Sequence, residues 1–205
     1  MDEKKEQKVE DIKAAAQAKA CPVQKALYYV AGFLDGPMCG RCFPCSLGSF
    51  EAGRRLQNIA EGRGTGADIS ALRRIAGHML EASMCKKGKD TARSIIEWME
   101  DGAFYAHICP PRADASGAGC RCPEKQCAGL VEFRVISEKC TRCGLCKDAC
   151  AHGAIFGEKR KPYLTGYPPF EIRQKRCVKC GDCLRACPEG AIEVADAAAG
   201  EPVKA

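Results

Sequence analysis

The sequence predicts an α+β protein, with a small helical bundle in its first half and a repetitive domain with short strands in its second. Apolar residues recur at helical spacing from Lys25 to about Phe104, and short β-like segments occur from Val131 onward. Cysteine makes up 17 of the 205 residues, whereas aromatic residues make up only 6%. Because the apolar cores must then be small, bound groups as well as burial are expected to hold the chain together.

A helical arm is expected over residues 1–24. Residues 2–20 carry ten charges among Ala and Gln and contain no Gly or Pro, which suits a solvated helix of weak amphipathicity. A frayed surface arm is the simpler interpretation, and an arm that docks along a partner subunit is the alternative. The segment has no apolar signal core, and the sequence contains no run of eighteen apolar residues. We therefore expect a cytoplasmic protein that does not enter a membrane.

A helical domain is expected over residues 25–104. Ile69, Leu72 and Ile75 follow helical spacing, and Gly-rich breaks separate the helical segments. The glycine run at 62–66 lies between two helical patterns rather than after a strand. It is therefore expected to connect helices and not to bind a nucleotide.

An internal repeat covers the last third of the chain. Each copy has four cysteines with the spacing C-x2-C-x2-C-x3-C, and the second copy follows the first by 37 residues. This spacing lets one loop hold three thiolates around a [4Fe–4S] cubane, while the fourth cysteine reaches the other cluster. The expected ligand sets are Cys140, Cys143, Cys146 and Cys187 for one cluster, and Cys177, Cys180, Cys183 and Cys150 for the other.

The repeat resembles bacterial-type two-cluster ferredoxins, so a 2×[4Fe–4S] ferredoxin-like domain is expected over residues 131–195, followed by a flexible tail over 196–205. Paired zinc knuckles would not explain a third Cys at the same short interval after the second. The second copy ends in Cys187-Pro188 like those ferredoxins, whereas the first reads Cys150-Ala151. This difference removes one rigid turn but no ligand.

A further group of cysteines lies in the helical domain. A C-x2-C-x2-C loop, Cys39-Gly-Arg-Cys42-Phe-Pro-Cys45, is followed forty residues later by Ser83-Met-Cys85. Three ligands can come from the loop, and Cys85 can supply a fourth if the bundle folds back. These motifs and the helices between them resemble the C-terminal cluster domain of the NADH-oxidising flavoprotein subunit of respiratory complex I. The corresponding subunits of electron-bifurcating hydrogenases and NAD-linked formate dehydrogenases carry that domain followed by a two-cluster ferredoxin.

The resemblance covers roughly residues 35–195. It implies a helical domain with a [4Fe–4S] cluster on Cys39, Cys42, Cys45 and Cys85, which in the family accepts electrons from the flavin. The sequence offers no Gly-rich strand-turn-helix unit for a flavin or for NAD, so neither is expected to bind to this chain. We therefore expect electron relay by thiolate-bound clusters, without a catalytic acid, base or nucleophile.

A Cys-rich hinge is expected over residues 105–130, where no helical or strand periodicity occurs. Its metal-type residues are His107, Cys109, Cys120, Cys122 and Cys127. The segment resembles the hinge of the bifurcating subunits, which holds a zinc ion between cluster domains. His107, Cys122 and Cys127 match best, Cys109 and Cys120 compete for the fourth place, and a fourth iron–sulfur cluster is the competing interpretation. Cys21 is then left over as a buried or idle thiol.

The formal net charge of +6 is close to what the cofactors would offset. An oxidised [4Fe–4S] core on four thiolates carries roughly −2, so three clusters supply about −6. Basic residues beside the cluster loops could help to dock an acidic partner such as a ferredoxin. No aromatic-interleaved basic stripe indicates nucleic acid. His152, beside a cluster loop, is expected at the surface.

The function expected from the sequence is to pass single electrons through three [4Fe–4S] clusters. A flavin- or NAD(P)H-linked subunit would lie at one end of this path, and a ferredoxin or catalytic metal subunit of the same oxidoreductase at the other. A structural or redox-sensing adaptor and a free-standing ferredoxin-type carrier are the alternatives.

Overall fold

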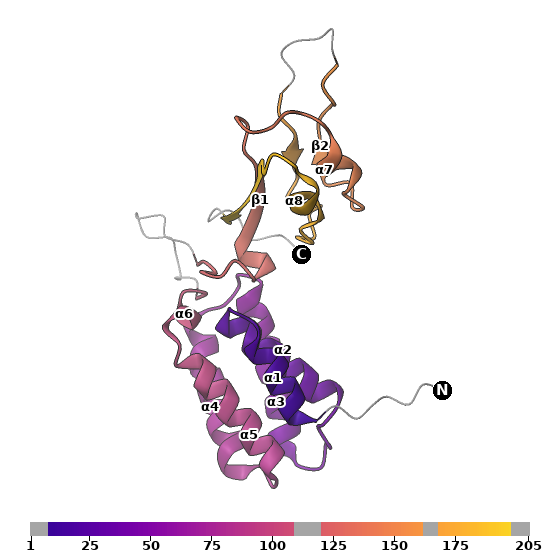
Figure 1. Ribbon diagram of the computed structural model, residues 1–205. Helices are drawn as coiled ribbons and strands as arrows, with labels where there is room; N and C mark the ends of the chain where they lie inside the picture. Colours follow the sequence, from indigo (N-terminus) through magenta and orange to yellow (C-terminus); the bar gives the residue numbers. More distant parts are fainter. Residues whose placement is uncertain (1–7, 109–119, 162–167, 198–205) are drawn as a thin grey trace, which may run out of the picture. The chain divides into compact units, whose positions relative to one another are not determined.

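The computed structural model describes residues 8–108, 120–161 and 168–197 (Figure 1). The chain divides into two compact units, one ending at Leu130 and the other beginning at Val131. The arm, the helical domain and the hinge, which the sequence analysis separates, all lie in the first unit. No helix in the described ranges is both long enough and apolar enough to cross a membrane.

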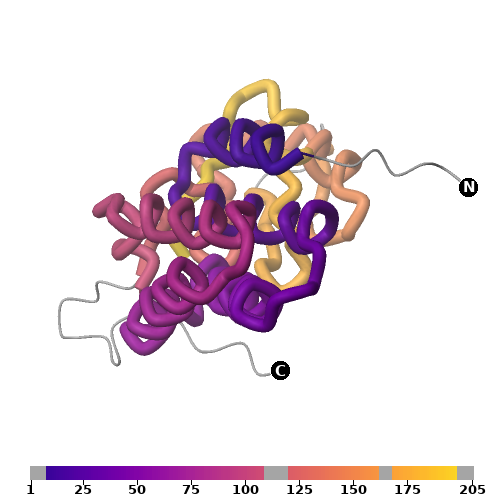
Figure 2. Tube along the Cα trace, turned by 90° about the horizontal axis from the view of Figure 1, so that it is seen from below, coloured from indigo at the N-terminus to yellow at the C-terminus, as the bar shows by residue number. Residues whose placement is uncertain are grey.

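The first unit is a bundle of five main helices that lie alongside one another (Figures 1 and 2). Helix α2 packs against α1, α3 and α5, and α4 packs against α3 and α5. The helices are α1 (Val9–Gln17), α2 (Pro22–Asp35), α3 (Phe43–Ala60), α4 (Gly66–Ala82) and α5 (Lys86–Met99), followed by the short α6 (Gly102–Tyr105) and the 3-10 turn η1 (Ala128–Leu130).

The helix starts follow from local sequence. Pro22 opens α2 at a position where a missing N–H removes no hydrogen bond. Thr65 and Asp68 form a capping box at the start of α4, and the Asp68 carboxylate also pairs with Arg55 of α3 at 2.9 Å. The glycine run at 62–66 therefore connects α3 to α4, as its position between two helical patterns predicts.

Helix α1 packs into the bundle. Ile12 is 3% exposed and Ala16 is fully buried, and both belong to the main core. Gly32 of α2 leaves room for Ile12, since a Cβ at Gly32 would come within 2.8 Å of the Ile12 side chain. Lys13 adds an ion pair with Glu97 of α5 at 3.1 Å. Over residues 9–17, the expectation of a frayed surface arm is wrong, because a two-residue apolar stripe is enough to dock the helix on α2.

The second unit contains two small antiparallel sheets. Strand β1 (Val131–Val135) pairs with β4 (Ile192–Asp196), and β2 (Ile155–Phe156) pairs with β3 (Glu171–Ile172). The short helices α7 (Leu145–Asp148) and α8 (Asp182–Ala186) each carry the third cysteine of one cysteine loop. The unit is thus a mixed structure of short helices and few strands.

The two copies of the sequence repeat share unusual backbone conformations. Arg142 and Lys179, at equivalent positions, have φ of 60° and 62°. The next pair, Gly144 and Gly181, has φ of 83° and 81°. Positive φ is costly for a residue with a Cβ, so its recurrence at Arg142 and Lys179 shows that both loops are wound in the same way.

Candidate metal centres

Three cavities are each lined by one of the cysteine sets expected from the sequence. Together, the three cavities collect twelve cysteines in groups of four. The first cavity is lined by Cys39, Cys42, Cys45 and Cys85, the second by Cys140, Cys143, Cys146 and Cys187, and the third by Cys150, Cys177, Cys180 and Cys183. The structure therefore brings together every residue of the three expected sets.

In the first cavity, two helix N-termini converge on the thiols. Cys42 is the N-cap of α3, and Cys85 is the N-cap of α5. The positive ends of these helices favour a group of net negative charge, such as a cubane on four thiolates. A hydrogen bond from the Met84 backbone lowers the pKa of Cys42. Burial, together with the charges of Cys42 and Cys85, raises the pKa of Cys45 to about 11.

The two cavities of the second unit exchange their fourth cysteine. Cys187, from the second copy, lines the cavity of the first loop, and Cys150, from the first copy, lines the cavity of the second loop. Cys150 accepts a hydrogen bond at 3.3 Å from the backbone N–H of Ala154, and Cys187 accepts one at 3.3 Å from that of Ala191. This exchange is the arrangement that the C-x2-C-x2-C-x3-C spacing predicts.

The third cysteine of each loop is the buried one. Cys146 lies on α7 and Cys183 on α8, and burial with the charges of neighbouring thiols raises the pKa of both, that of Cys183 to about 11. Such thiols are poor anions on their own. A bound cationic iron core would stabilise the thiolate form, so the donor set fits a [4Fe–4S] group.

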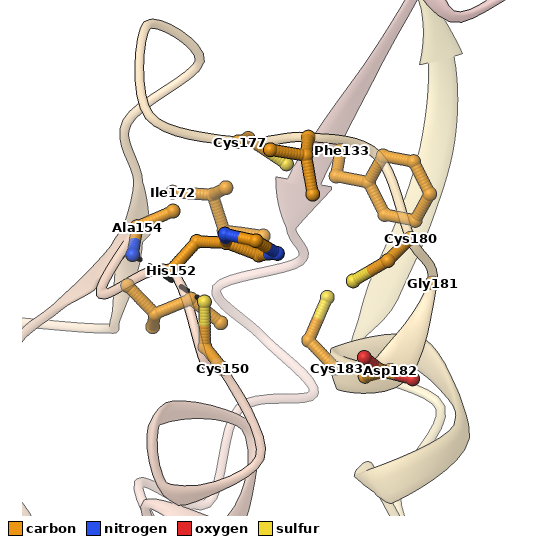
Figure 3. Close-up of a pocket in the computed structure, with 12 residues that line it drawn as sticks. Phe133, Cys150, His152, Ala154, Ile172, Cys177, Cys180, Gly181, Asp182 and Cys183 are labelled. Atoms are coloured by element: carbon orange, nitrogen blue, oxygen red, sulfur yellow. Dashed lines mark hydrogen bonds between the residues drawn. The ribbon is translucent and has the colours of Figure 1, made fainter.

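Figure 3 shows the side chains that line the third cavity. The sulfur atoms of Cys150, Cys180 and Cys183 point toward a common space, which Phe133 and Ile172 border on the apolar side. The imidazole of His152 reaches toward the same space, although the residue is exposed, as expected. His152 is therefore part of the wall of the third cavity. Its position two residues after Cys150 is compatible with this placement but does not by itself predict it.

A fourth group of ligand atoms lies in the first unit. Cys21, His107, Cys122 and Cys127 are all buried, and their ligand atoms lie within 4.8 Å of one another. The Cys21 Sγ is 3.7 Å from the Cys127 Sγ and 3.2 Å from the His107 Nε2. With Zn–S bonds of about 2.3 Å, the edge of a tetrahedral zinc site is about 3.8 Å. The group therefore has the size of a site for a single tetrahedral ion.

Hydrogen bonds orient these four ligands. The Nδ1 of His107 lies 2.9 Å from the Ala103 carbonyl oxygen, which leaves Nε2 facing the thiols. The backbone N–H of Gln126 donates to the Cys122 Sγ at 3.3 Å, and the Gln24 amide donates to the Cys127 Sγ at 3.4 Å. The Gln126 side chain in turn accepts from the Cys21 N–H at 3.1 Å. Such outer contacts fix the ligand geometry of metal sites.

The thiols of this group compete for protons. Hydrogen bonds with Cys127 and Cys21 lower the pKa of Cys122, whereas hydrogen bonds with Cys122 and Cys21 raise that of Cys127. Burial lowers the pKa of His107, but its hydrogen bonds to Cys122 and Cys21 outweigh burial and raise it to about 10. Three thiolates cannot all ionise here without a cation, so the donor chemistry fits a divalent metal.

The membership of this group corrects the sequence analysis at one position. His107, Cys122 and Cys127 belong to the group as expected, but its fourth member is Cys21, which the sequence leaves over as a buried or idle thiol. Cys120 lies outside the group, and Cys109 lies outside the described residues. Cys21 is the N-cap of α2, and 86 residues separate it from His107. No local spacing links it to the hinge.

Comparison with known proteins agrees with the two kinds of cluster motif. Residues 25–102 match the family described as the NADH-ubiquinone oxidoreductase-F iron-sulfur binding region, and residues 139–191 match the 4Fe-4S dicluster domain. The chain is an iron–sulfur protein that joins these two domains. The resemblance drawn from the cysteine motifs is thereby confirmed.

Two curated proteins similar to this iron–sulfur protein are subunits of a hydrogenase and of a formate dehydrogenase. The chain is 30% identical over 145 residues to the NADP-reducing hydrogenase subunit HndC of Solidesulfovibrio fructosivorans, which covers 70% of this chain and 28% of the relative. It is 29% identical over 158 residues to the NADP(+)-dependent formate dehydrogenase subunit beta of Moorella thermoacetica, which covers 76% of this chain and 20% of the relative. The chain thus spans less than a third of the length of these relatives.

Proposed function

We propose that this iron–sulfur protein passes single electrons through three [4Fe–4S] clusters within a larger oxidoreductase. The observation that carries the proposal is the sorting of twelve cysteines into three cavities, four in each, with the exchanged fourth ligand in the second unit. A [4Fe–4S] cluster supplies one-electron redox chemistry, because its core accepts or releases one electron at a time. A two-electron donor of the flavin or NAD(P)H class would therefore hand over its two electrons in separate steps.

The chain's own part in this relay is to hold and shield the clusters. Cys42, Cys45 and Cys85 bind at converging helix N-termini, where the partial positive charge of the helices stabilises added negative charge. In the second unit, Phe133, Ile155 and Ile172 give the third cavity an apolar border. No side chain needs to transfer a proton for an electron to pass.

An exposed apolar strip beside the first cavity supports a partner at this end of the relay. Phe43, Leu47 and Phe50 lie on one face of α3 and are 74%, 51% and 62% exposed, and Met84, beside Cys85, is 83% exposed. Exposed apolar side chains gathered in this way indicate an interaction surface. We assign it to the flavin- or NAD(P)H-linked subunit, in keeping with the NADP-linked names of the relatives. A ferredoxin or a catalytic metal subunit would receive the electrons.

The hinge site is proposed to hold one Zn²⁺ on Cys21, His107, Cys122 and Cys127. The short distances between the ligand atoms support a single ion over a fourth cluster, whose core would push the thiolates further apart. The ion would fasten the start of α2 to the hinge. A cytoplasmic location belongs to the same proposal and rests on the need to keep so many thiols reduced.

Metal analysis of anaerobically purified protein tests this function. We expect about twelve iron atoms, from three cubanes, and one zinc per chain. Cys42→Ser, Cys143→Ser and Cys180→Ser should each remove the spectroscopic signal of one cluster only. Reduction by a flavin-containing partner should become slow in Cys42→Ser. Full clusters in the wild type combined with an unchanged rate of partner-driven turnover in all three variants would favour the structural-adaptor alternative instead.

A further inference from the structure

Two buried serine hydroxyls beside the first cavity have no hydrogen-bond partner. Ser49 is 0% exposed and Ser83 is 3% exposed. Their Oγ atoms belong to a set of five buried side-chain polar atoms without a partner among the described residues. A buried hydroxyl left unpaired is unfavourable, so each such group calls for a physical explanation.

Ser49 differs from other hydroxyl residues of the bundle in its hydrogen bonding. Ser46, Ser70 and Thr91 each donate to the carbonyl oxygen four residues earlier, at 3.0 to 3.2 Å. Ser49 lies in the middle of α3, where the same bond is open to it, yet its Oγ does not make it. The hydroxyl is therefore available to a neighbour outside the backbone.

Both serines lie in the neighbourhood of the Cys45 thiol. Ser49 follows Cys45 by one helical turn, on the same face of α3, and its hydroxyl lowers the pKa of that thiol against the larger opposing effect of burial. The tight packing around Gly88 shows where the Ser83 hydroxyl lies. A Cβ at Gly88 would lie 2.9 Å from the Ser83 Oγ and 3.0 Å from the Cys45 Sγ, so both atoms border the same small space.

We propose that Ser49 and Ser83 donate hydrogen bonds to the sulfur atoms of the first cluster and hold its reduction potential at a higher value than the four thiolates alone would give. The acceptor is the Cys45 thiolate, which would be one of the four ligands of that cluster. The inference rests on the proposed function, since it needs a [4Fe–4S] cluster on Cys39, Cys42, Cys45 and Cys85.

The physical reason is the change in charge on reduction. The reduced cluster carries one more negative charge than the oxidised cluster, so a hydrogen bond to sulfur stabilises the reduced form more strongly. Cys45 is 6% exposed and the two serines are buried, so water does not readily replace a lost donor at this thiol. Ser49 and Ser83 thus change the reduction potential through hydrogen bonds and are not ligands of the iron.

The test is a redox titration of the first cluster, followed by electron paramagnetic resonance, in the full-length holoprotein. The Ser49→Ala/Ser83→Ala double variant should lower the ratio of reduced to oxidised first cluster about tenfold at a fixed potential, a shift of ~59 mV to lower potential for a one-electron couple. Each single variant should give part of the shift. Ser49→Thr, which keeps the hydroxyl, should stay near the wild-type value.

The control is Ser46→Ala, which removes a neighbouring hydroxyl that already bonds to the backbone. It should leave all potentials unchanged, and the clusters of the second unit should not shift in any variant. An unmoved potential in the double variant, or a shift to higher potential, would overturn the inference, as would loss of the first cluster in both Ala variants, because the role assigned is tuning and not assembly. A wild-type protein without a first cluster would refute the proposed function itself.

Discussion

Replacing Cys21 by Ser should release the zinc and loosen the first unit. The thiol is fully buried, 3.7 Å from the Cys127 Sγ and 3.2 Å from the His107 Nε2. Three ligands remain in the variant, but none of them lies on α2. Any zinc that is still bound would no longer fasten this helix to the hinge.

The size of the effect follows from the length of chain that the metal closes. Cys21 and His107 are 86 residues apart in the sequence. The chain-entropy value for a cross-link of this span is about 4–5 kcal/mol, and a metal that closes a long loop restricts the unfolded chain in the same way. For a protein of this length, each kcal/mol shifts the Tm by about 2–4 °C. We expect the Tm of Cys21→Ser to fall by on the order of 10–20 °C.

The assay combines metal content with thermal unfolding of the holoprotein. Zinc per chain is measured by mass spectrometry of the metals after dialysis against a chelator, and iron is measured in the same sample. Cys21→Ser should lose zinc and keep its iron, whereas the matched variant Cys120→Ser should keep both. Cobalt substitution should give thiolate charge-transfer bands that weaken in Cys21→Ser.

The opposite pattern of metal content would refute this account. If Cys21→Ser retained zinc and the wild-type Tm while Cys120→Ser lost the metal, the site would be built from the hinge alone. If iron instead of zinc occupied the site in the wild type, the interpretation as a fourth cluster would replace the zinc site.

Three further predictions address other parts of the first unit. Gly88→Ala should lower the occupancy of the first cluster and destabilise the protein by about 1–3 kcal/mol, because the new methyl group would press on the Cys45 Sγ and the Ser83 side chain; iron content and thermal melts measure both effects. Asp68→Asn should cost about 1 kcal/mol at neutral pH. Burial raises the pKa of Asp68, but hydrogen bonds from Thr65 and Arg55 lower it overall. The stability is therefore present above the ordinary carboxyl pKa and is lost as the pH falls through the lowered value. Melts of both proteins should show a constant difference down to about pH 5, which narrows between about pH 5 and pH 2. Phe50→Glu should slow reduction by a flavin-containing partner at least tenfold with unchanged iron content, and equal rates would show that the apolar strip is not the contact surface.

The cluster-binding residues could be predicted from the sequence because their chemistry is local. A C-x2-C-x2-C loop holds three thiolates within a few residues, and the repeat shows where the fourth must come from. Cys21 gave no such signal, since it stands alone before Pro22 and reaches its partners only through the packing of α2. Proximity in the sequence instead favours Cys109 and Cys120 as the fourth ligand beside Cys122.

The docking of α1 was hard to predict for a related reason. Its apolar face consists of little more than Ile12 and Ala16, and ten charges in residues 2–20 outweigh them in any average over the segment. What decides the outcome is the complementary surface on α2, where Gly32 leaves room for Ile12. Complementarity of this kind depends on two distant segments at once, which a pattern read along one segment does not contain.

The core of the second unit explains why this chain has so many cysteines and so few aromatic residues. Its buried apolar side chains are few, and six of the eight cluster cysteines either belong to this core or pack against it. These side chains therefore surround the cavities and do not fill them. With its two sheets of at most five residue pairs each, the unit has little other long-range structure to keep the loops apart. Filling the cavities with clusters would complete the core, so cluster binding and the stability of this unit should be coupled. This coupling is also why cysteine spacing, and not hydrophobic patterning, carries most of the fold information in residues 131–195.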